Sequence, residues 1–496
     1  MTTTEESLPL QVSEFLSSGP LKGFVGGQWV GAEDGATLTT RDPGSGAELT
    51  QLAAMGAGDV DRAVQAADHA FHNTGWAKMT PGERGVLLHR LTDVIEEHKD
   101  TLAWIESLDA GKILAQSQWD VDYFILTMRY FIDLSLNIPR RVPLAVSGHE
   151  AATVRLPWGP CGFIFPWNFP FLLIGWNIAP ALAAGNTVVI KPAEDTPLSA
   201  IYLGQLAQKA GIPDGVINIV TGYGETAGAA LAGHPGLKRM AFTGSPEVGR
   251  LVAEVCGRNL TPVKLELGGK GAAVVFDDVD IEATADQLMG AITFHTGQVC
   301  CDATRWLIQK SIFNDLADAC VKRMKAVKVG YQLDADTQMG PVVNAKQQSR
   351  ILDYLKRGES QGAECLLEGG VADVAGRDGF YVKPALLSGK LDNVAAREEI
   401  FGPVAFLSPF DDEKQAIAMV NDTDYGLANS VWSTDVARTE RVAEQMVAGS
   451  SWINAHNVFP HGVPYGGINK SGMGGGVLSV ETYMDYMRSL SIVRPL

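Results

Sequence analysis

The sequence predicts an α/β protein with two doubly wound domains and a small β arm. Strand and helix patterns alternate between residues 187 and 267, which predicts a parallel sheet with helices on both faces. A less regular alternation over 306–470 predicts a second α/β domain. Extended segments over 137–156 and 489–496 break the helical pattern and predict the arm.

The composition indicates a folded, acidic protein. The chain has 496 residues, of which 46% are hydrophobic, and this length predicts two or three domains with large cores. The formal net charge of −17 argues against nucleic acid and anionic membranes as partners, because both bind clustered Lys and Arg.

The cysteines and the first residues favour a reducing compartment. Six cysteines are scattered along the chain without a C-x-x-C pair, so we predict neither a disulfide framework nor a metal site. The acidic start is not followed by an apolar region, which is unlike a secretory signal or an Arg-rich transit peptide. We therefore expect a cytoplasmic protein.

One apolar segment has two interpretations. Residues 161–185 form a run of 25 residues without a charge, which is long enough to span a bilayer. The run contains Pro166, Pro170 and Pro180, and also Asn168 and Asn177. We favour a strand, a turn and a helix buried in a core.

The N-terminal region predicts mainly helices. Residues 1–20 predict a polar, partly helical segment, and 23–30 predict a hairpin with glycine turns. Asp59 is the expected N-cap of a long helix. Apolar stripes over 87–95 and 102–108 predict two more helices, and we interpret each stripe as a core face.

The first alternation places polar residues and glycines at strand ends. We expect strands over 187–190, 216–221, 239–242 and 263–267, and helices over 196–210, 225–232 and 246–256. Ligands bind at the carboxyl ends of parallel strands. The candidates at these ends are Lys191, Glu194, Gly222, Gly224, Thr243 to Ser245, and Glu266.

The second alternation and the arm complete the predicted elements. We expect strands over 305–309, 404–407, 430–432 and 451–454, and helices over 312–326 and 412–421. An exposed apolar edge strand is a liability. We therefore expect the segments 137–156 and 489–496 to cover each other or a neighbouring subunit.

Cys300 and Glu266 are the candidates for chemistry. Cys300 follows a turn at 297–299, and Glu266 ends an apolar run before paired glycines. They are 34 residues apart, enough for a strand, a helix and a return to one cleft. A thiol can attack a carbon and a carboxylate can then activate water. The alternatives are buried inert thiols at Cys300 and Cys301, and an ion pair of Glu266 with Lys264 or Lys270.

Two glycine turns are candidates for phosphate binding. The segment 222–228 nearly matches the dinucleotide fingerprint, but its third glycine comes one place late, and a plain turn explains it as well. In 242–249, Ser245 suits an N-cap and Pro246 the first helical position. Gly244 would let a phosphate approach the N–H groups of that helix, although an ordinary capped helix is the alternative.

Three polar residues have a functional and a plain interpretation. Lys191 and Glu194 could hold ribose hydroxyls, and Glu194 would repel a 2′-phosphate and so favour NAD over NADP; a solvated loop pair is the alternative. Asn168 stands among aromatics and prolines. It is either a satisfied core asparagine or an N–H donor to an oxyanion.

Six motifs appear in order and together resemble the NAD(P)-dependent aldehyde dehydrogenase superfamily. They are Phe165-Pro-Trp-Asn-Phe-Pro170, Lys191-Pro-Ala-Glu194, Phe242-Thr-Gly-Ser245, Leu265-Glu-Leu-Gly-Gly-Lys270, Gly297-Gln-Val-Cys300 and Glu399-Ile-Phe-Gly-Pro403. The resemblance runs from about residue 20 to the C-terminus. It implies a Rossmann-like NAD-binding domain over 1–136 and 157–266, a catalytic domain over 267–474, and an oligomerisation arm over 137–156 and 475–496. It also implies a homo-oligomer, a tetramer built as a dimer of dimers.

The resemblance implies a role for each matched residue. Cys300 matches the nucleophile, Glu266 the general base, and Asn168 the oxyanion donor together with the backbone N–H of Cys300. The implied cofactor-binding residues are Phe165, Trp167, Lys191, Glu194, Gly224, Phe242, Gly244, Ser245, Gly249, Leu267, Glu399 and Phe401. The implied substrate-lining residues are Phe169, Trp176, Phe294, Cys301, Phe459 and Tyr465.

The implied reaction is aldehyde oxidation to a carboxylic acid with NAD. The Cys300 thiolate adds to the aldehyde carbon, hydride leaves for the nicotinamide, and Glu266 activates the water that hydrolyses the resulting thioester. The presence of Glu266 favours this hydrolytic type over a coenzyme-A-acylating type.

The sequence departs from the family at three positions. The family usually has Arg-Glu where this chain has Gly475 and Gly476, and many members have a lysine where it has Asn177. The missing glutamate and lysine are partners in the exit of the proton from the base. We therefore expect the proton to leave Glu266 by water or backbone.

The substrate prediction is an apolar or aryl aldehyde. No Arg or Lys stands at the predicted lining positions, so a charged aldehyde would lack a partner. The glycine-rich tail is similar to that of phenylacetaldehyde dehydrogenases, while medium-chain aliphatic aldehydes are the alternative. Two other classes compete: a cysteine hydrolase or acyltransferase without a nucleotide, and a binding protein on a dehydrogenase scaffold.

Overall fold

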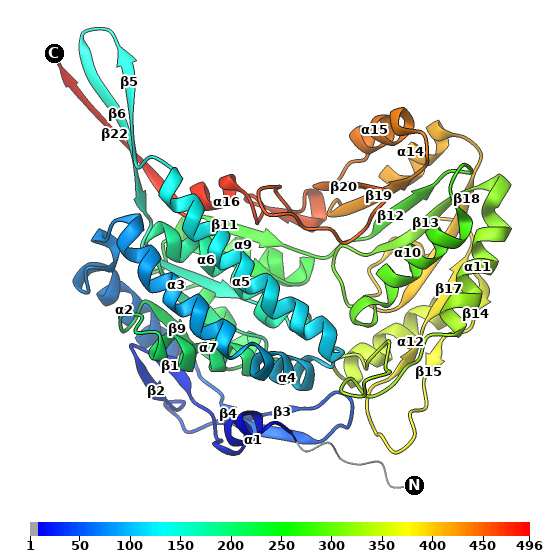
Figure 1. Ribbon diagram of the computed structural model, residues 1–496, viewed down its shortest axis with the longest axis horizontal. Coiled ribbons are helices and arrows are strands. Elements are labelled where there is room, and N and C mark those ends of the chain that lie inside the picture. Colours follow the sequence, from blue (N-terminus) through cyan, green and yellow to red (C-terminus); the bar gives the residue numbers. More distant parts are fainter. Residues whose placement is uncertain (1–7) are drawn as a thin grey trace.

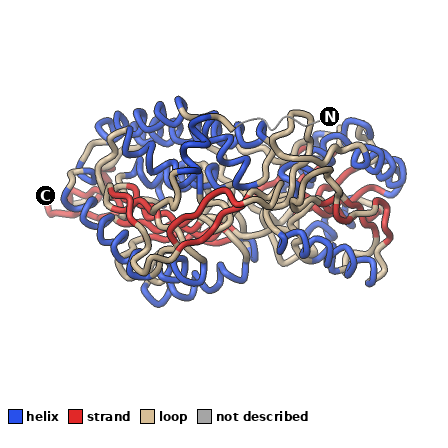
Figure 2. Tube along the Cα trace, turned by 90° about the horizontal axis from the view of Figure 1, so that it is seen from below, coloured by secondary structure: helices blue, strands red, loops and turns tan. Residues whose placement is uncertain are grey.

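The computed structural model of the protein describes residues 8–496 and has two lobes. Each lobe is built on one sheet, and a narrow arm of strands projects from the first lobe (Figure 1). Seen from below, strands run through the middle of both lobes and helices cover both sides (Figure 2). The predicted fold class, two doubly wound α/β units with a β arm, is confirmed.

The first sheet provides the strand ends that the sequence singled out. Within residues 8–496 it has eight strands in the order β2-β1-β9-β8-β7-β10-β11-β21. The five strands from β9 to β11 run parallel, while the edge strands pair antiparallel. Their bounds are β1 (Gly23–Val25), β2 (Gln28–Val30), β7 (Pro160–Ile164), β8 (Thr187–Lys191), β9 (Ile217–Ile219), β10 (Arg239–Thr243), β11 (Val263–Glu266) and β21 (Gly472–Met473).

Helices cover both faces of this sheet because its middle strands are apolar on both sides. One face is covered by α2 (Ala57–Asn73), α8 (Ala229–Ala232) and α9 (Pro246–Asn259). The other face is covered by α3 (Pro81–Glu97), α4 (Lys99–Ala110), α5 (Leu114–Asn137), α6 (Pro170–Ala184) and α7 (Leu198–Lys209).

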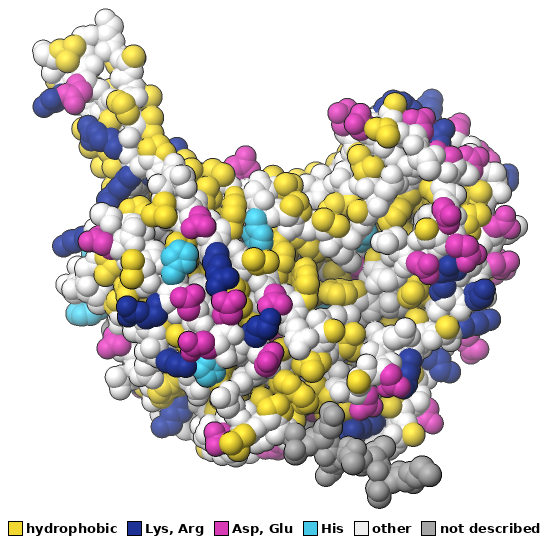
Figure 3. All heavy atoms as spheres, viewed as in Figure 1, with side chains coloured by type: hydrophobic (Ala, Val, Ile, Leu, Met, Phe, Trp, Pro, Cys, Tyr) yellow, Lys and Arg dark blue, Asp and Glu magenta, His cyan; other side chains and the backbone are white. Residues whose placement is uncertain are grey.

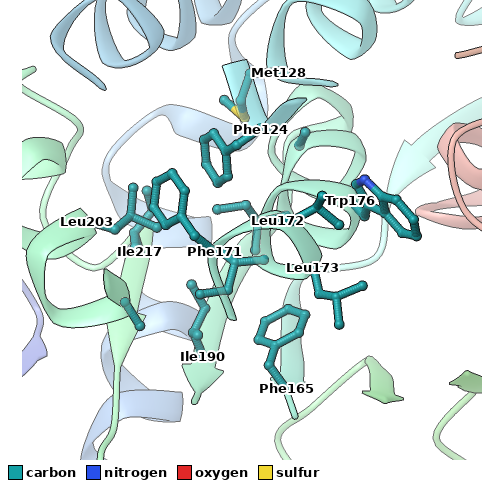
Figure 4. Close-up of a cluster of buried hydrophobic side chains, with 14 of the residues drawn as sticks. Phe124, Met128, Phe165, Phe171, Leu172, Leu173, Trp176, Ile190, Leu203 and Ile217 are labelled. Atoms are coloured by element: carbon teal, nitrogen blue, oxygen red, sulfur yellow. The ribbon is translucent and has the colours of Figure 1, made fainter. Parts of the chain in front are cut away.

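Helix α6 is the centre of the larger core (Figure 4). Every one of its residues is buried, which explains why the segment carries no charge. Phe171 of α6 stacks on Phe124 of α5 with ring centroids 4.2 Å apart. Gly185, with φ of 97°, ends the helix in the left-handed conformation that glycine tolerates. In the described part of the chain, no helix combines the length and apolarity needed to cross a membrane.

The second sheet has seven strands among the described residues, in the order β14-β17-β18-β13-β12-β19-β20. Six of them run parallel, and only β14 pairs antiparallel. The strands are β12 (Gly271–Val275), β13 (Ala303–Gln309), β14 (Glu364–Leu367), β17 (Ala385–Ser388), β18 (Val404–Phe410), β19 (Ala428–Trp432) and β20 (Ser450–Ile453). The helices are α10 (Ile281–Thr293), α11 (Phe313–Lys325), α12 (Ala345–Ser360), α13 (Val394–Arg397), α14 (Glu413–Asn421) and α15 (Val436–Gln445).

The arm consists of three antiparallel strands, β5 (Arg141–Val146), β6 (His149–Pro157) and β22 (Met487–Pro495). Strand β22 pairs with β6 along its whole length. The expectation that the two extended segments cover each other is confirmed. Helix α16 (Val480–Asp485) leads into β22 and packs on α6.

The smaller elements include one correction to the sequence analysis. Helix α1 (Leu10–Ser17), the hairpin β3 (Thr37–Arg41) to β4 (Glu48–Ala53), and the pair β15 (Gly370–Val371) and β16 (Val382–Lys383) complete the described elements. The predicted N-cap Asp59 was wrong, because Gly56 precedes α2. Asp59 lies in the first turn and its carboxylate accepts a hydrogen bond from Gly56 N at 2.9 Å. Residues 1–7 of the predicted N-terminal segment lie outside the described residues.

We predict that Phe171→Ala destabilises the first lobe by about 3–5 kcal/mol, because it removes a fully buried ring from the core. The shift in the urea midpoint of the first unfolding transition measures this loss. Val371→Ala is the control, since Val371 is 54% exposed and should change the free energy of unfolding by less than about 0.5 kcal/mol. Equal shifts for the two variants would contradict the central position of α6.

Candidate active site

A large cleft lies between the two lobes, at the carboxyl ends of the parallel strands of the first sheet. Its volume is about 1620 Å³, larger than the usual pocket for one small ligand. The surface is visibly hollowed there and apolar side chains line the hollow (Figure 3). All the predicted site residues except Gly222 and Gly249 line this cleft. Gly249 lies within α9, where a Cβ would stand 2.6 Å from Leu267 Cδ2. Its role is therefore to let α9 pack closely against Leu267.

Close backbone contacts fix the turn that carries Cys300. Gly297 has φ of 67°, and a Cβ there would stand 2.3 Å from the carbonyl of Gly402. A Cβ at Gly269 would stand 2.4 Å from the backbone oxygen of Cys300. Only glycine allows such approaches, so three separate glycine motifs of the sequence meet at this turn. His295, five residues before Cys300, also has a positive φ, 44°, which marks a strained backbone in the same segment.

Hydrogen-bonding groups surround the sulfur of Cys300. Its Sγ lies 3.5 Å from the hydroxyl of Tyr465. The pKa of Cys300 is lowered, because the thiol of Cys301 and then the Tyr465 hydroxyl can donate hydrogen bonds to its thiolate, and these outweigh burial. The thiol of Cys301 also contacts Asn457 Oδ1 at 3.3 Å. A lowered pKa increases the thiolate fraction near neutral pH, which a nucleophile requires.

Asn168 lies at the entrance of α6 and is 3% exposed. Its Nδ2 donates a hydrogen bond to the backbone oxygen of Gln298 at 3.0 Å. This bond holds the amide against the turn that carries Cys300, and an amide nitrogen has a second N–H to offer. One N–H of Asn168 is therefore satisfied within the protein, and the amide also lines the cleft.

Glu266 ends strand β11 and is buried, with 7% of its surface exposed. In the described part of the chain neither carboxylate oxygen has a hydrogen-bonding partner. No ion pair joins it to Lys264 or Lys270 among the described residues. Burial raises the pKa of Glu266, the charge of Lys264 opposes this rise, and Cys300 adds to it. A carboxylate with a raised pKa is a stronger base, as the activation of water requires.

One end of the cleft contains the polar groups that the sequence analysis assigned to cofactor binding. Lys191 Nζ lies 3.2 Å from a carboxylate oxygen of Glu194. Ser245 caps α9 by accepting from Val248 N at 3.3 Å, which confirms the predicted cap. The remaining N–H groups at the start of this 14-residue helix would stabilise a bound anion. Gly224 begins a short π-helical turn that leads into α8.

Glu399 links the two lobes at the cleft. Its carboxylate accepts a hydrogen bond from Gly269 N at 2.9 Å, and burial raises its pKa to about 7. Phe401 has φ of 63° and its ring lies edge-on to Trp167, with centroids 5.3 Å apart. This strained backbone holds an aromatic ring beside the cleft.

The other end of the cleft is aromatic. Trp176, Phe459 and Tyr465 contact one another with ring centroids 5.1–5.5 Å apart. Phe169 and Phe294 form a second stacked pair at 6.1 Å. The sequence analysis missed several lining residues, namely Trp119, Leu172, Leu173, Val299, His456 and Asn457. Of these residues, only Val299 could have been found from the sequence, because it directly precedes Cys300.

The fold and the site define an α/β oxidoreductase in which a cysteine and a carboxylate share one nucleotide-sized cleft. Residues 29–492 match the model of the aldehyde dehydrogenase family. The chain belongs to the aldehyde dehydrogenase family, as the sequence motifs predicted. It is an aldehyde dehydrogenase by both sequence and fold.

Three comparisons describe the relatives. The chain is 39% identical over 480 residues to the phenylacetaldehyde dehydrogenase of Pseudomonas fluorescens, covering 94% of each chain. It is 40% identical over 456 residues to human retinal dehydrogenase 2, covering 91% of this chain and 87% of the relative. Its fold is similar to the NAD+ complex of an aldehyde dehydrogenase from Bacillus cereus, with a TM-score of 0.96, 35% identity and 99% coverage of both chains.

We predict that Tyr465→Phe raises the pKa of Cys300 by about one unit, because a donor to the thiolate is lost while the ring stays in place. The rate of iodoacetamide alkylation at Cys300, followed across pH, should therefore reach its midpoint at a higher pH. Tyr223→Phe, at a residue that is 45% exposed, should leave the profile unchanged. An unshifted profile for Tyr465→Phe would show that the Tyr465 hydroxyl does not lower the pKa of Cys300.

Proposed function

We propose that this protein oxidises an apolar aldehyde to the carboxylic acid with NAD, through a thioester on Cys300. The observation that carries the proposal is the meeting of Cys300, Asn168 and Glu266 in one cleft. The same cleft contains Lys191 and Glu194, and the start of α9 also opens into it. A hydrolase without a nucleotide would not require those groups. A binding protein would not require the catalytic set.

The residues on the cofactor side fit a dinucleotide. The N-terminus of α9 suits a pyrophosphate, and the carboxylates of Glu194 and Glu399 suit ribose hydroxyls. NAD, when bound, would supply the hydride acceptor. Similar solved structures include an NAD+ complex, which supports NAD as the cofactor. Glu194 would repel a 2′-phosphate, so we propose NAD rather than NADP.

The protein's own groups account for the other steps. The Cys300 thiolate adds to the aldehyde carbon, and the second N–H of Asn168 with the backbone N–H of Cys300 stabilises the negative charge on oxygen. Each such donor is worth about 3–4 kcal/mol in the transition state. After hydride loss, Glu266 takes a proton from the water that attacks the thioester. The acid leaves and the Cys300 thiolate is restored.

The aromatic end of the cleft supports an apolar or aryl substrate. Trp176, Phe459 and Tyr465 present rings, and the names of two relatives, phenylacetaldehyde and retinal dehydrogenase, denote apolar aldehydes. We propose phenylacetaldehyde as the first aldehyde to test. A medium-chain aliphatic aldehyde is the alternative that the same apolar surface accepts.

The arm supports self-association. Leu144, Leu490, Ile492 and Val493 on its strands are each at least 40% exposed. Apolar residues on a projecting sheet are a typical contact surface between subunits. We propose a homotetramer built as a dimer of dimers. The domain division at residues 136, 156, 266 and 474 and the cytoplasmic location stay predictions.

We predict that Cys300→Ala abolishes aldehyde oxidation, whereas Glu266→Gln gives one burst of NADH followed by slow turnover, because acylation survives the loss of the base. Stopped-flow absorbance of NADH measures both phases. Cys365→Ala is the matched control, since Cys365 is exposed and remote from the lining residues. Normal steady-state turnover in the first two variants would contradict the assigned roles.

A second prediction concerns specificity. With NAD, phenylacetaldehyde should show a kcat/KM at least tenfold higher than succinic semialdehyde, because burying one unpaired carboxylate costs about 1.4 kcal/mol or more. NAD should exceed NADP by a similar factor, and Glu194→Gln should reduce that preference. Absorbance assays on an aldehyde panel with both cofactors measure these ratios. A preference for the charged aldehyde would contradict the apolar site.

A further inference from the structure

A buried lysine lies beside the proposed base. Lys264 is two residues before Glu266 on strand β11, so both side chains project from the same face of the sheet. The lysine is 1% exposed, and among the described residues its Nζ has no hydrogen-bonding partner. An unpaired buried ammonium is costly, so burial favours the neutral amine, which can accept a proton.

Other charged groups continue from Lys264 towards the surface. Its Nζ lies 5.6 Å from the centroid of the Tyr486 ring, and the guanidinium of Arg239 lies 5.2 Å from the same ring. Arg239 Nη2 is 3.4 Å from a carboxylate oxygen of Asp485, whose side chain is 37% exposed. Glu266, Lys264, Arg239 and Asp485 therefore form a series from the cleft to the solvent.

The backbone leaves no room here for the family's usual acidic partner. A Cβ at Gly476 would stand 2.4 Å from the backbone oxygen of Tyr465. A Cβ at Gly475 would stand 2.5 Å from the Asp485 carboxylate. Asn177, in place of the family's lysine, is 2% exposed and donates to Leu173 O at 3.0 Å. None of these three residues can exchange a proton with Glu266.

We infer that Lys264 accepts the proton from Glu266 after thioester hydrolysis and passes it to the solvent at Asp485. The inference rests on the proposed function. No hydrogen bond joins the two groups among the described residues, so a water between them relays the proton. The O–H bond of the Glu266 carboxylic acid breaks, the water passes a proton on, and an N–H bond forms on the neutral amine. The resulting ammonium then loses that proton to water beside Asp485. One proton leaves the site in each turnover and both groups return to their starting forms.

The electrostatics of the pair suit this exchange. Burial raises the pKa of Glu266 and lowers the pKa of Lys264, so the two values approach each other. The charges of Glu266 and Asp485 oppose the fall for Lys264, while Arg239 adds to it. The Tyr486 ring also faces Lys264, and burial raises the pKa of the Tyr486 hydroxyl. This hydroxyl therefore stays protonated, and Lys264 is the acceptor.

Two substitutions at this position separate proton transfer from simple charge. Lys264→Met keeps the volume and removes the amine, while Lys264→Arg keeps a cation that does not give up its proton. We expect both variants to form the first equivalent of NADH at the wild-type rate and to deacylate about tenfold or more slowly, which produces an NADH burst. Stopped-flow absorbance gives the burst, and the steady-state rate gives deacylation. Thermal unfolding of each variant checks that the fold is retained.

Chemical rescue provides the second measurement. Small primary amines such as ethylamine should restore deacylation in Lys264→Ala, because they place an amine where the side chain was. Asp485→Asn should slow turnover in dilute buffer, and concentrated buffer should restore it. If Lys264 had only a structural role, neither the amine nor the concentrated buffer would restore deacylation.

The outcomes are distinct. Wild-type deacylation in Lys264→Met overturns the inference. So does full activity in Lys264→Arg, which would leave Lys264 as a fixed charge that adjusts the pKa of Glu266. A wild-type enzyme that forms no NADH from an aldehyde and NAD would instead overturn the proposed function itself.

Discussion

The site depends on one constraint, the contact of the Cys300 turn with two glycine-lined backbone segments. Gly269 follows the strand that carries Glu266, and Gly402 follows Glu399. Because the turn packs directly against both backbones, the sulfur has a fixed position relative to Glu266 and to Glu399. A side chain at Gly269 or Gly297 would push these backbones apart, so orientation here comes from the main chain.

The chemistry is divided between the lobes. The first sheet supplies Glu266, Asn168 and the start of α9, while the turn before the second sheet supplies Cys300. Glu399 joins them through its bond to Gly269 N. The buried setting raises the pKa of Glu266, while neighbouring donors lower the pKa of Cys300. Burial raises the pKa of both groups, and the two values move in opposite directions because only Cys300 has donors that outweigh burial.

Much of this could be predicted from the sequence, for identifiable reasons. Alternating strands and helices have a local period, and the Ser245-Pro246 cap has a local geometry, so both are encoded in a few adjacent residues. The contact of Tyr465 with Cys300 joins residues 165 positions apart and has no local signal. The positions of His456 and Trp119 in the cleft, and the space around Gly476, likewise depend on how distant loops pack. Asp59 was misplaced because carboxylates suit both the cap and the first turn.

The pairing of β22 with β6 and of β21 with β11 has a consequence for synthesis of the chain. Both strands come from the last 25 residues and add to structures begun within residues 149–266. While the ribosome still holds the C-terminus, the edges beside β6 and β11 present unpaired N–H and C=O groups. Long-range pairing of this kind forms late and leaves nascent strands open to aggregation. Truncation from the C-terminus therefore damages the earliest-made lobe.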